Sequence, residues 1–166
     1  IDMSQKVFTK PRTTLIPFSS DTVSPAISAP PPPMKKPKFF FQGRFVPSKG
    51  VILLIDIFSK PPMLDYELHL IGRADLFSER LHGKYSDTLK IEELLKRTPP
   101  NIIIHGHKSQ KELTNIISKL DCFINPSTFH DDDFGIANLQ AYSLNKYLIL
   151  SEWGGLKDFL KFPQTY

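Results

Sequence analysis

Short apolar runs alternate along this chain with longer segments of mixed polarity, a pattern that predicts strands separated by helices. The expected strands are the runs at 39–41, 66–71, 101–104, 122–124 and 147–150. The expected helices fill 49–59, 75–97 with a break near 82–86, 109–120, 134–144 and 154–160. Because the strands lack strict apolar/polar alternation, the sheet should be parallel and buried on both faces. We therefore predict an α/β fold, a doubly wound parallel sheet of Rossmann-like type, with ligands at the carboxyl ends of its strands.

Residues 1–38 differ in composition from the rest of the chain. They are rich in proline and serine and include the four consecutive prolines 30–33. Proline fixes φ and lacks an N–H group, so this part should be extended polyproline II, either a linker or interdomain segment or a terminal tail. Residues 39–166 should form one Rossmann-like domain. The chain starts at Ile1 rather than Met and stops soon after a glycine turn, so we expect it to be a piece of a longer protein.

Length and composition narrow the class of protein. A chain of 166 residues with 40% hydrophobic content can bury one core, and two full domains would not fit. The formal charge of +4 is mildly basic, but no dense stripe of Lys and Arg with interleaved aromatics is present, so nucleic-acid binding is not expected. Cys122 is the single cysteine, which excludes an intramolecular disulfide or a thiol zinc site and favours a reducing compartment. No apolar run reaches the roughly 18 residues of a membrane span, so we expect a soluble protein.

The segment 43–50, GRFVPSKG, follows the first expected strand and carries two cations at a helix start. Arg44 offers a planar fork of donors and Lys49 a mobile point charge, so together they could hold the two phosphates of a pyrophosphate. The alternative is a pair of solvated surface cations.

The segment 126–141, PSTFHDDDFGIANLQA, places an acidic cluster, a Phe-Gly turn and an amphipathic helix directly after an apolar strand. A glycine lets the backbone approach a ligand, and the helix start directs unpaired N–H groups at negative charge. Carboxylates beside that anion site would repel bare phosphate but accept hydrogen bonds from hydroxyls, which favours a nucleotide sugar. The acids 131–133 could instead bind a hard cation, or they could be acidic residues that the helix dipole favours at a helix N-terminus. Residues 133–135 also spell the metal-binding motif of protein kinases. We reject that interpretation, because the sequence has no glycine-rich phosphate loop and no catalytic loop with its Asp and Asn.

The third polar segment, His105-Gly106-His107-Lys108, follows another expected strand. A metal site at the two histidines is one interpretation. A strand-end glycine followed by polar residues fits a loop that contacts a nucleobase better, and we favour that interpretation.

In order along the chain, GRFVPSKG, YELHLIG, IIIHGHKSQKEL, LDCFINPS, DDFGIANLQA and GGLKDF resemble the C-terminal, donor-binding half of family 4 retaining glycosyltransferases with the two-domain B-type (GT-B) fold. The resemblance covers about residues 39–160. It implies transfer of a sugar, with retention at the anomeric carbon, from a nucleoside diphosphate sugar without a metal or other cofactor. It also implies an N-terminal acceptor domain that is not in this chain, and a glycan, lipid or other hydroxyl compound as acceptor. The implied location is cytoplasmic, with peripheral contact at the cytoplasmic face of a membrane as one option.

The resemblance also assigns site residues. It implies that Gly43, Arg44 and Lys49 bind the diphosphate and that His107 and Lys108 face the nucleobase. The backbone of Phe134, Gly135 and Ile136 should lie near the sugar and phosphate. The family's paired glutamates correspond to Asp132, the expected catalytic carboxylate, and to Gln140, which should accept from ribose hydroxyls.

Both acidic positions depart from the family pattern. Asp132 is one methylene shorter than glutamate, and Gln140 loses the ionised acceptor, so we expect weaker donor binding. These departures motivate one alternative to the transferase, a non-catalytic module that binds a nucleotide sugar or a partner. A second alternative is a different enzyme of the same fold, such as a nucleotide-sugar epimerase.

Overall fold

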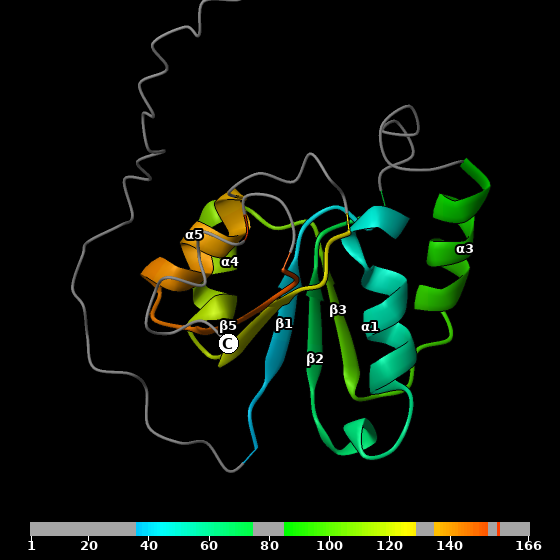
Figure 1. The fold of residues 1–166 in the computed structure, drawn as a ribbon, viewed down its shortest axis with the longest axis horizontal. Helices are drawn as coiled ribbons and strands as arrows, with labels where there is room; N and C mark the ends of the chain where they lie inside the picture. Colours follow the sequence, from blue (N-terminus) through cyan, green and yellow to red (C-terminus); the bar gives the residue numbers. More distant parts are fainter. Residues whose placement is uncertain (1–35, 75–84, 129–134, 153–155, 157–166) are drawn as a thin grey trace, which may run out of the picture.

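The computed structural model describes residues 36–74, 85–128, 135–152 and 156. Within them, a five-stranded sheet has the order β3-β2-β1-β4-β5, as Figure 1 shows. The strands are β1 (Phe39–Gln42), β2 (Leu68–Ile71), β3 (Ile102–Gly106), β4 (Cys122–Asn125) and β5 (Tyr147–Leu150). The helices are α1 (Val51–Phe58), α3 (Tyr85–Leu95), α4 (Gln110–Ile117) and α5 (Ile136–Ser143), with short 3-10 turns η1 (Pro47–Lys49) and η2 (Met63–Asp65).

All neighbouring strands pair in parallel, which confirms the predicted sheet. The chain order changes direction at β1, because β2 and β3 lie on one side of it and β4 and β5 on the other. In a doubly wound sheet this switch point is where loops diverge and leave space for a ligand. The topology therefore indicates a ligand site at the carboxyl ends of β1 and its neighbours.

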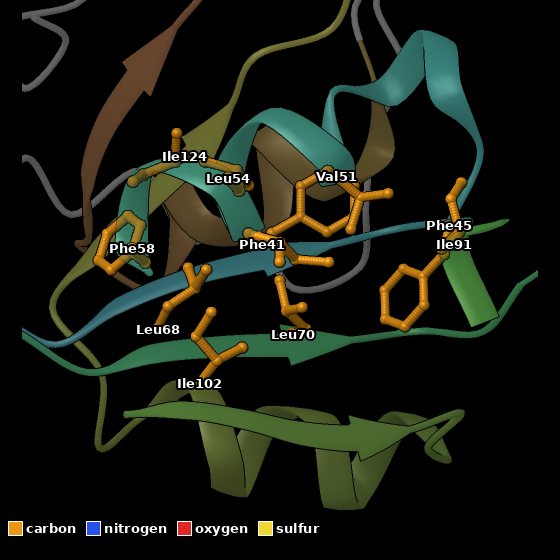
Figure 2. Packing of buried hydrophobic residues seen from close by; sticks show 11 residues of the cluster. Phe41, Phe45, Val51, Leu54, Phe58, Leu68, Leu70, Ile91, Ile102 and Ile124 are labelled. Carbon is orange, nitrogen blue, oxygen red and sulfur yellow. The ribbon is translucent and has the colours of Figure 1, made fainter. Parts of the chain in front are cut away.

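Two hydrophobic clusters cover the two faces of the sheet, because successive strand residues point to opposite sides. Phe41 of β1 belongs to the cluster that includes Leu54 and Phe58 of α1, and Figure 2 shows these α1 side chains lying over the strands. Phe40, the preceding residue, packs on the other side with Ile117 of α4 and Ala141 of α5. Burial on both faces explains why the strands read as unbroken apolar runs.

Helix α1 begins later than the sequence indicated. The apolar run predicted a helix from Lys49, but η1 comes first and Gly50 separates it from α1 with a left-handed φ of 74°. Proline starts the 3-10 turn and glycine permits the change of direction, so this prediction was wrong by two residues at its start. Helix α4 starts with a capping box, in which the Glu112 carboxylate accepts a 3.0 Å hydrogen bond from the Ser109 N–H.

Several sequence predictions fall outside the described residues. These are the extended segment at 1–35, the first part of the 75–97 helix and most of the helix expected at 154–160. Among the described residues, no helix is long and apolar enough to cross a membrane.

Candidate functional site

Strands β1, β2 and β3 each end at a glycine at the same edge of the sheet. The Gly43 N–H donates to the Ile71 carbonyl and the Gly72 N–H to the Gly106 carbonyl, each at 3.0 Å. Gly72 has a φ of +148°, and a Cβ placed there would overlap the Gly43 carbonyl oxygen. These backbones therefore approach so closely that only glycine fits at position 72.

A cavity of about 330 Å³ opens at this edge. It is lined by Gln42, Gly43, Arg44, Ile71, Gly72, Arg73, His107, Lys108 and Leu113. The structure thus brings together four of the predicted site residues from two motifs that are some 60 positions apart in sequence: Gly43, Arg44, His107 and Lys108. The described lining has two arginines, one lysine and no acidic side chain, so its electrostatics suit an anion.

Arg73 also lines the cavity, although the sequence patterns did not predict it as a site residue. It follows Gly72 at the end of β2 as Arg44 follows Gly43 at the end of β1, so the chain repeats a strand-Gly-Arg pattern. The two loops stay paired beyond the strands, because the Phe45 N–H donates to the Arg73 carbonyl at 2.8 Å and Phe45 bridges Ala74. Recognising the repeat would have placed a second guanidinium at the cavity.

Lys49 does not line this cavity. It is the last residue of η1 and is half-buried beside the connection that follows β4. There the Ser48 carbonyl accepts hydrogen bonds from the Thr128 N–H at 2.9 Å and from the Ser127 hydroxyl at 3.3 Å. The predicted diphosphate segment therefore contacts the chain leading to the acidic segment, as the common sheet edge requires.

Helix α5 begins at this edge too. Gly135 precedes it with a φ of 68°, and a Cβ there would lie 2.7 Å from the Asn138 amide nitrogen. Asn138 is fully buried and accepts a 2.9 Å hydrogen bond from the Asn125 side chain at the end of β4. This buried amide pair fixes the helix start against the strand. Ile136, the first helical residue, is 69% exposed.

Gln140 lies on the buried side of α5, with 7% of its surface exposed. Its Oε1 accepts a 3.0 Å hydrogen bond from Nε2 of Gln42, the last residue of β1. Gln42 lines the cavity, whereas Gln140 is not among the lining residues. Gln42 was not predicted as a site residue, because an isolated glutamine at a strand end carries no recognisable signal.

Two predicted residues, Asp132 and Phe134, lie outside the described residues, as do Asp131 and Asp133. The catalytic assignment of Asp132 and the alternative of an aspartate cation site stay predictions. Within the described part of the chain, no three His, Cys, Asp or Glu side chains converge in a way that could hold a metal ion.

His105 contacts His69 of β2. The His69 Nδ1 and His105 Nε2 atoms are 2.8 Å apart, and the rings stack at 14° with centroids 5.1 Å apart. Burial lowers the pKa of His69, against the opposing effect of Glu67, whose carboxylate lies 3.2 Å from the His69 ring. Burial also lowers the pKa of His105, assisted by His69 and Lys108. His105 therefore belongs to a contact between β2 and β3, while His107 lines the cavity.

Comparison with known proteins agrees with this arrangement. The chain is 25% identical over 120 residues to lipopolysaccharide 1,2-N-acetylglucosaminetransferase of Salmonella typhimurium, covering 72% of this chain and 31% of that protein. It is 29% identical over 121 residues to an uncharacterized glycosyltransferase of Methanocaldococcus jannaschii, covering 72% and 30%. The chain thus spans about a third of the length of the curated relatives it matches.

Solved structures show the same fold. HepE of Anabaena in complex with UDP and glucose superposes with a TM-score of 0.59 at 20% identity, covering 75% of this chain and 32% of that one. The C-terminal domain of a group 1 glycosyl transferase from Francisella tularensis superposes with a TM-score of 0.52 at 22% identity, covering 70% and 60%. These likenesses confirm the predicted Rossmann-like α/β fold, shared with B-type glycosyltransferases.

The family match covers more of the chain than either relative. Residues 25–163 match the family described as glycosyl transferases group 1. That span includes the whole described sheet and every residue of the cavity. The chain belongs to the group 1 glycosyl transferases.

Proposed function

We propose that this chain is the donor-binding, C-terminal domain of a family 4 retaining glycosyltransferase, which transfers a hexose from a nucleoside diphosphate sugar. The observation that carries the proposal is the cation-lined cavity at the carboxyl ends of β1, β2 and β3. Family membership supports the transferase activity. We also propose that residues 39–166 form this domain, that residues 1–38 connect it to the rest of the protein, and that the protein works in the cytoplasm.

The charged residues act on the leaving group. During transfer, the bond between the anomeric carbon and the diphosphate oxygen breaks, and that oxygen gains negative charge. Positive groups fixed beside the developing charge stabilise the transition state more than the ground state. Arg44, Arg73 and Lys108 line the cavity where that diphosphate would lie, and Lys49 would approach it from η1. We propose that these side chains supply the positive charge without a metal or other cofactor.

The remaining predicted residues take roles at the sugar and the nucleoside. Gly43 would let the backbone approach the diphosphate, and His107 would contact the nucleobase from the cavity wall. The backbone of Phe134, Gly135 and Ile136 would face the sugar and phosphate. Asp132 would be the catalytic carboxylate beside the sugar, and Gln140 would act at the ribose hydroxyls. An N-terminal domain of the longer protein would bring the acceptor, a glycan, lipid or other hydroxyl compound.

Calorimetry on the 166-residue chain with a panel of nucleoside diphosphates tests the proposal. UDP is the first ligand to try, because solved relatives were determined with UDP and UDP-glucose. Arg44→Ala combined with Lys49→Ala should abolish binding. Lys60→Ala is the matched control, since Lys60 is an exposed cation paired with Asp56 at the far end of α1. Equal affinity in the double variant and the wild type would reject the assignment.

A non-catalytic sugar-nucleotide module is the second candidate. It is favoured by the neutral Gln140, which is buried and bonded to another amide instead of presenting a carboxylate. Introducing Asp132→Glu and Gln140→Glu into the full-length protein separates the two functions. A transferase should retain or gain sugar transfer, whereas absence of transfer in both the wild type and the double variant favours the silent module.

A further inference from the structure

The amide pair Gln42–Gln140 has hydrogen-bonding capacity that the described residues leave unused. One hydrogen bond joins Gln42 Nε2 to Gln140 Oε1. The other two atoms, Gln42 Oε1 and Gln140 Nε2, are buried without a partner in the part of the chain that the structure describes. A buried amide atom without a partner costs free energy, and such groups are uncommon unless a ligand or water completes them.

The position of the pair indicates which side a ligand would come from. Gln42 ends β1 and lines the cavity, directly before Gly43 and Arg44. Gln140 sits behind it on α5 and holds its amide in place. The unpartnered Oε1 of Gln42 therefore belongs to a side chain that lines the cavity and is hydrogen-bonded to α5. Exchanging the two ends of both amides preserves one mutual hydrogen bond, so the pair can present either a carbonyl or an amino group.

The charge around the cavity separates two kinds of ligand group. Arg44, Arg73 and Lys108 suit phosphates, which need cationic donors. A neutral amide cannot compete with them for an anion, but it matches a hydroxyl group, which both donates and accepts. The lining thus combines cationic side chains with the neutral amide of Gln42 at the end of β1.

We propose that Gln42 is a specificity-determining residue that hydrogen-bonds a hydroxyl of the bound donor, with Gln140 as the residue that positions it. The inference rests on the proposed function, because it assumes a nucleoside diphosphate sugar in the cavity. Ribose hydroxyls and sugar hydroxyls share the required chemistry, and the choice of ligands distinguishes them.

The test uses Gln42→Met, which keeps the length of the side chain and removes its amide, in the 166-residue chain. Calorimetry measures the affinity of the chain for four ligands: pyrophosphate, 2′,3′-dideoxyuridine diphosphate, UDP and UDP-glucose. The variant should bind pyrophosphate as the wild type does, which also shows that the cavity is folded. Its affinity for the hydroxyl-bearing ligand should fall about two- to tenfold, the effect of one neutral hydrogen bond. A loss for UDP but not for the dideoxy compound assigns the ribose, and an added loss for UDP-glucose assigns the sugar.

Gln140→Met and the double variant Gln42→Met/Gln140→Met test the positioning role. If Gln140 acts only through Gln42, the double variant discriminates between hydroxyl and deoxy ligands no worse than Gln42→Met alone. The double variant also removes both ends of the buried pair, which guards against misfolding from a single unpaired amide. Unchanged ratios among the four ligands in Gln42→Met would overturn the inference while UDP binding by the wild type upholds the donor site. A wild type that binds none of the diphosphates would refute the proposed function itself.

Discussion

The Ser48 carbonyl oxygen accepts a 2.9 Å hydrogen bond from the Thr128 N–H, joining residues that are 80 positions apart in the chain. Ser48 lies in η1, directly before Lys49, and Thr128 lies in the connection between β4 and α5. A bond between two backbone groups does not depend on side-chain identity, so it fixes the relative position of the two segments. The cationic segment 43–50 and the start of the segment after β4, up to Thr128, are thereby held at one edge of the sheet.

Gly50 makes this contact possible, and Gly50→Ala should destabilise the fold. A Cβ at position 50 would lie 2.7 Å from both the side chain and the carbonyl oxygen of Pro126, and φ is 74°. Gly106→Ala is the matched control, because Gly106 has a φ of 71° but a Cβ there meets nothing within 4 Å. The control should lose about 1 kcal/mol from backbone strain alone. Urea unfolding should show a larger loss for Gly50→Ala, and equal losses would mean that the Pro126 contact yields readily.

Arg73→Ala should weaken nucleoside diphosphate binding as strongly as Arg44→Ala does. Both guanidinium groups line the cavity after equivalent strand-end glycines. A charged hydrogen bond contributes about 1.5 kcal/mol or more, so each variant should lose about tenfold or more in affinity. Calorimetry at low and at moderate salt should show the loss shrinking as salt screens the exposed charge. A loss confined to Arg44→Ala would show that only the β1 arginine reaches the ligand.

The sequence predicted the sheet well because each described strand is a short apolar run between clear breaks. It predicted the start of α1 less well, since the prediction joined Lys49 and Gly50 to the apolar run that begins at Val51 and so missed the change from η1 to α1. At the cavity, Arg44 and His107 could be predicted because they occupy recognisable motifs at strand ends. Gln42 could not be, because its placement depends on a contact with Gln140, 98 residues away. Long-range pairing of two ordinary amides leaves no local pattern.

Acid should destabilise the fold through the His69–His105 contact. The pKa of each histidine is lowered in the folded state, chiefly by burial. Above the ordinary value of about 6.5 both rings are neutral in the folded and unfolded chain, and no stability is lost. Below it the unfolded chain binds protons that the folded chain disfavours, so stability falls as the pH drops from that value toward the lowered pKa.

Replacing both rings tests this assignment. His69→Gln with His105→Gln should flatten the dependence of unfolding free energy on pH between about 7 and 5, measured by urea titration. His107→Gln is the control, because His107 is exposed and lies two residues beyond His105. An unchanged slope in the double variant would place the acid sensitivity elsewhere.

Cys122 should resist alkylation in the folded protein. The side chain is buried in β4, and burial raises the pKa of its thiol to about 12. The thiolate is the reactive form, so at neutral pH the folded chain presents almost none of it. Iodoacetamide labelling followed by mass spectrometry should be slow in buffer and rapid in denaturant. Fast labelling of the native chain would show that β4 opens readily.

Lys146 should contribute to stability through the end of α4. Its Nζ donates to the Leu120 carbonyl at 2.6 Å and to the Ser118 carbonyl at 3.1 Å, where carbonyl groups have no partner further along the helix. Burial lowers the pKa of this amine, yet the charge is stabilising at a helix C-terminus. Lys146→Met keeps the aliphatic stem and removes both donors, so it should cost about 1–3 kcal/mol of unfolding free energy. Lys119→Met, at an exposed position beside the same turn, should change little. An equal loss of unfolding free energy in Lys146→Met and Lys119→Met would show that positive charge near the helix end matters, and not the two hydrogen bonds of Lys146.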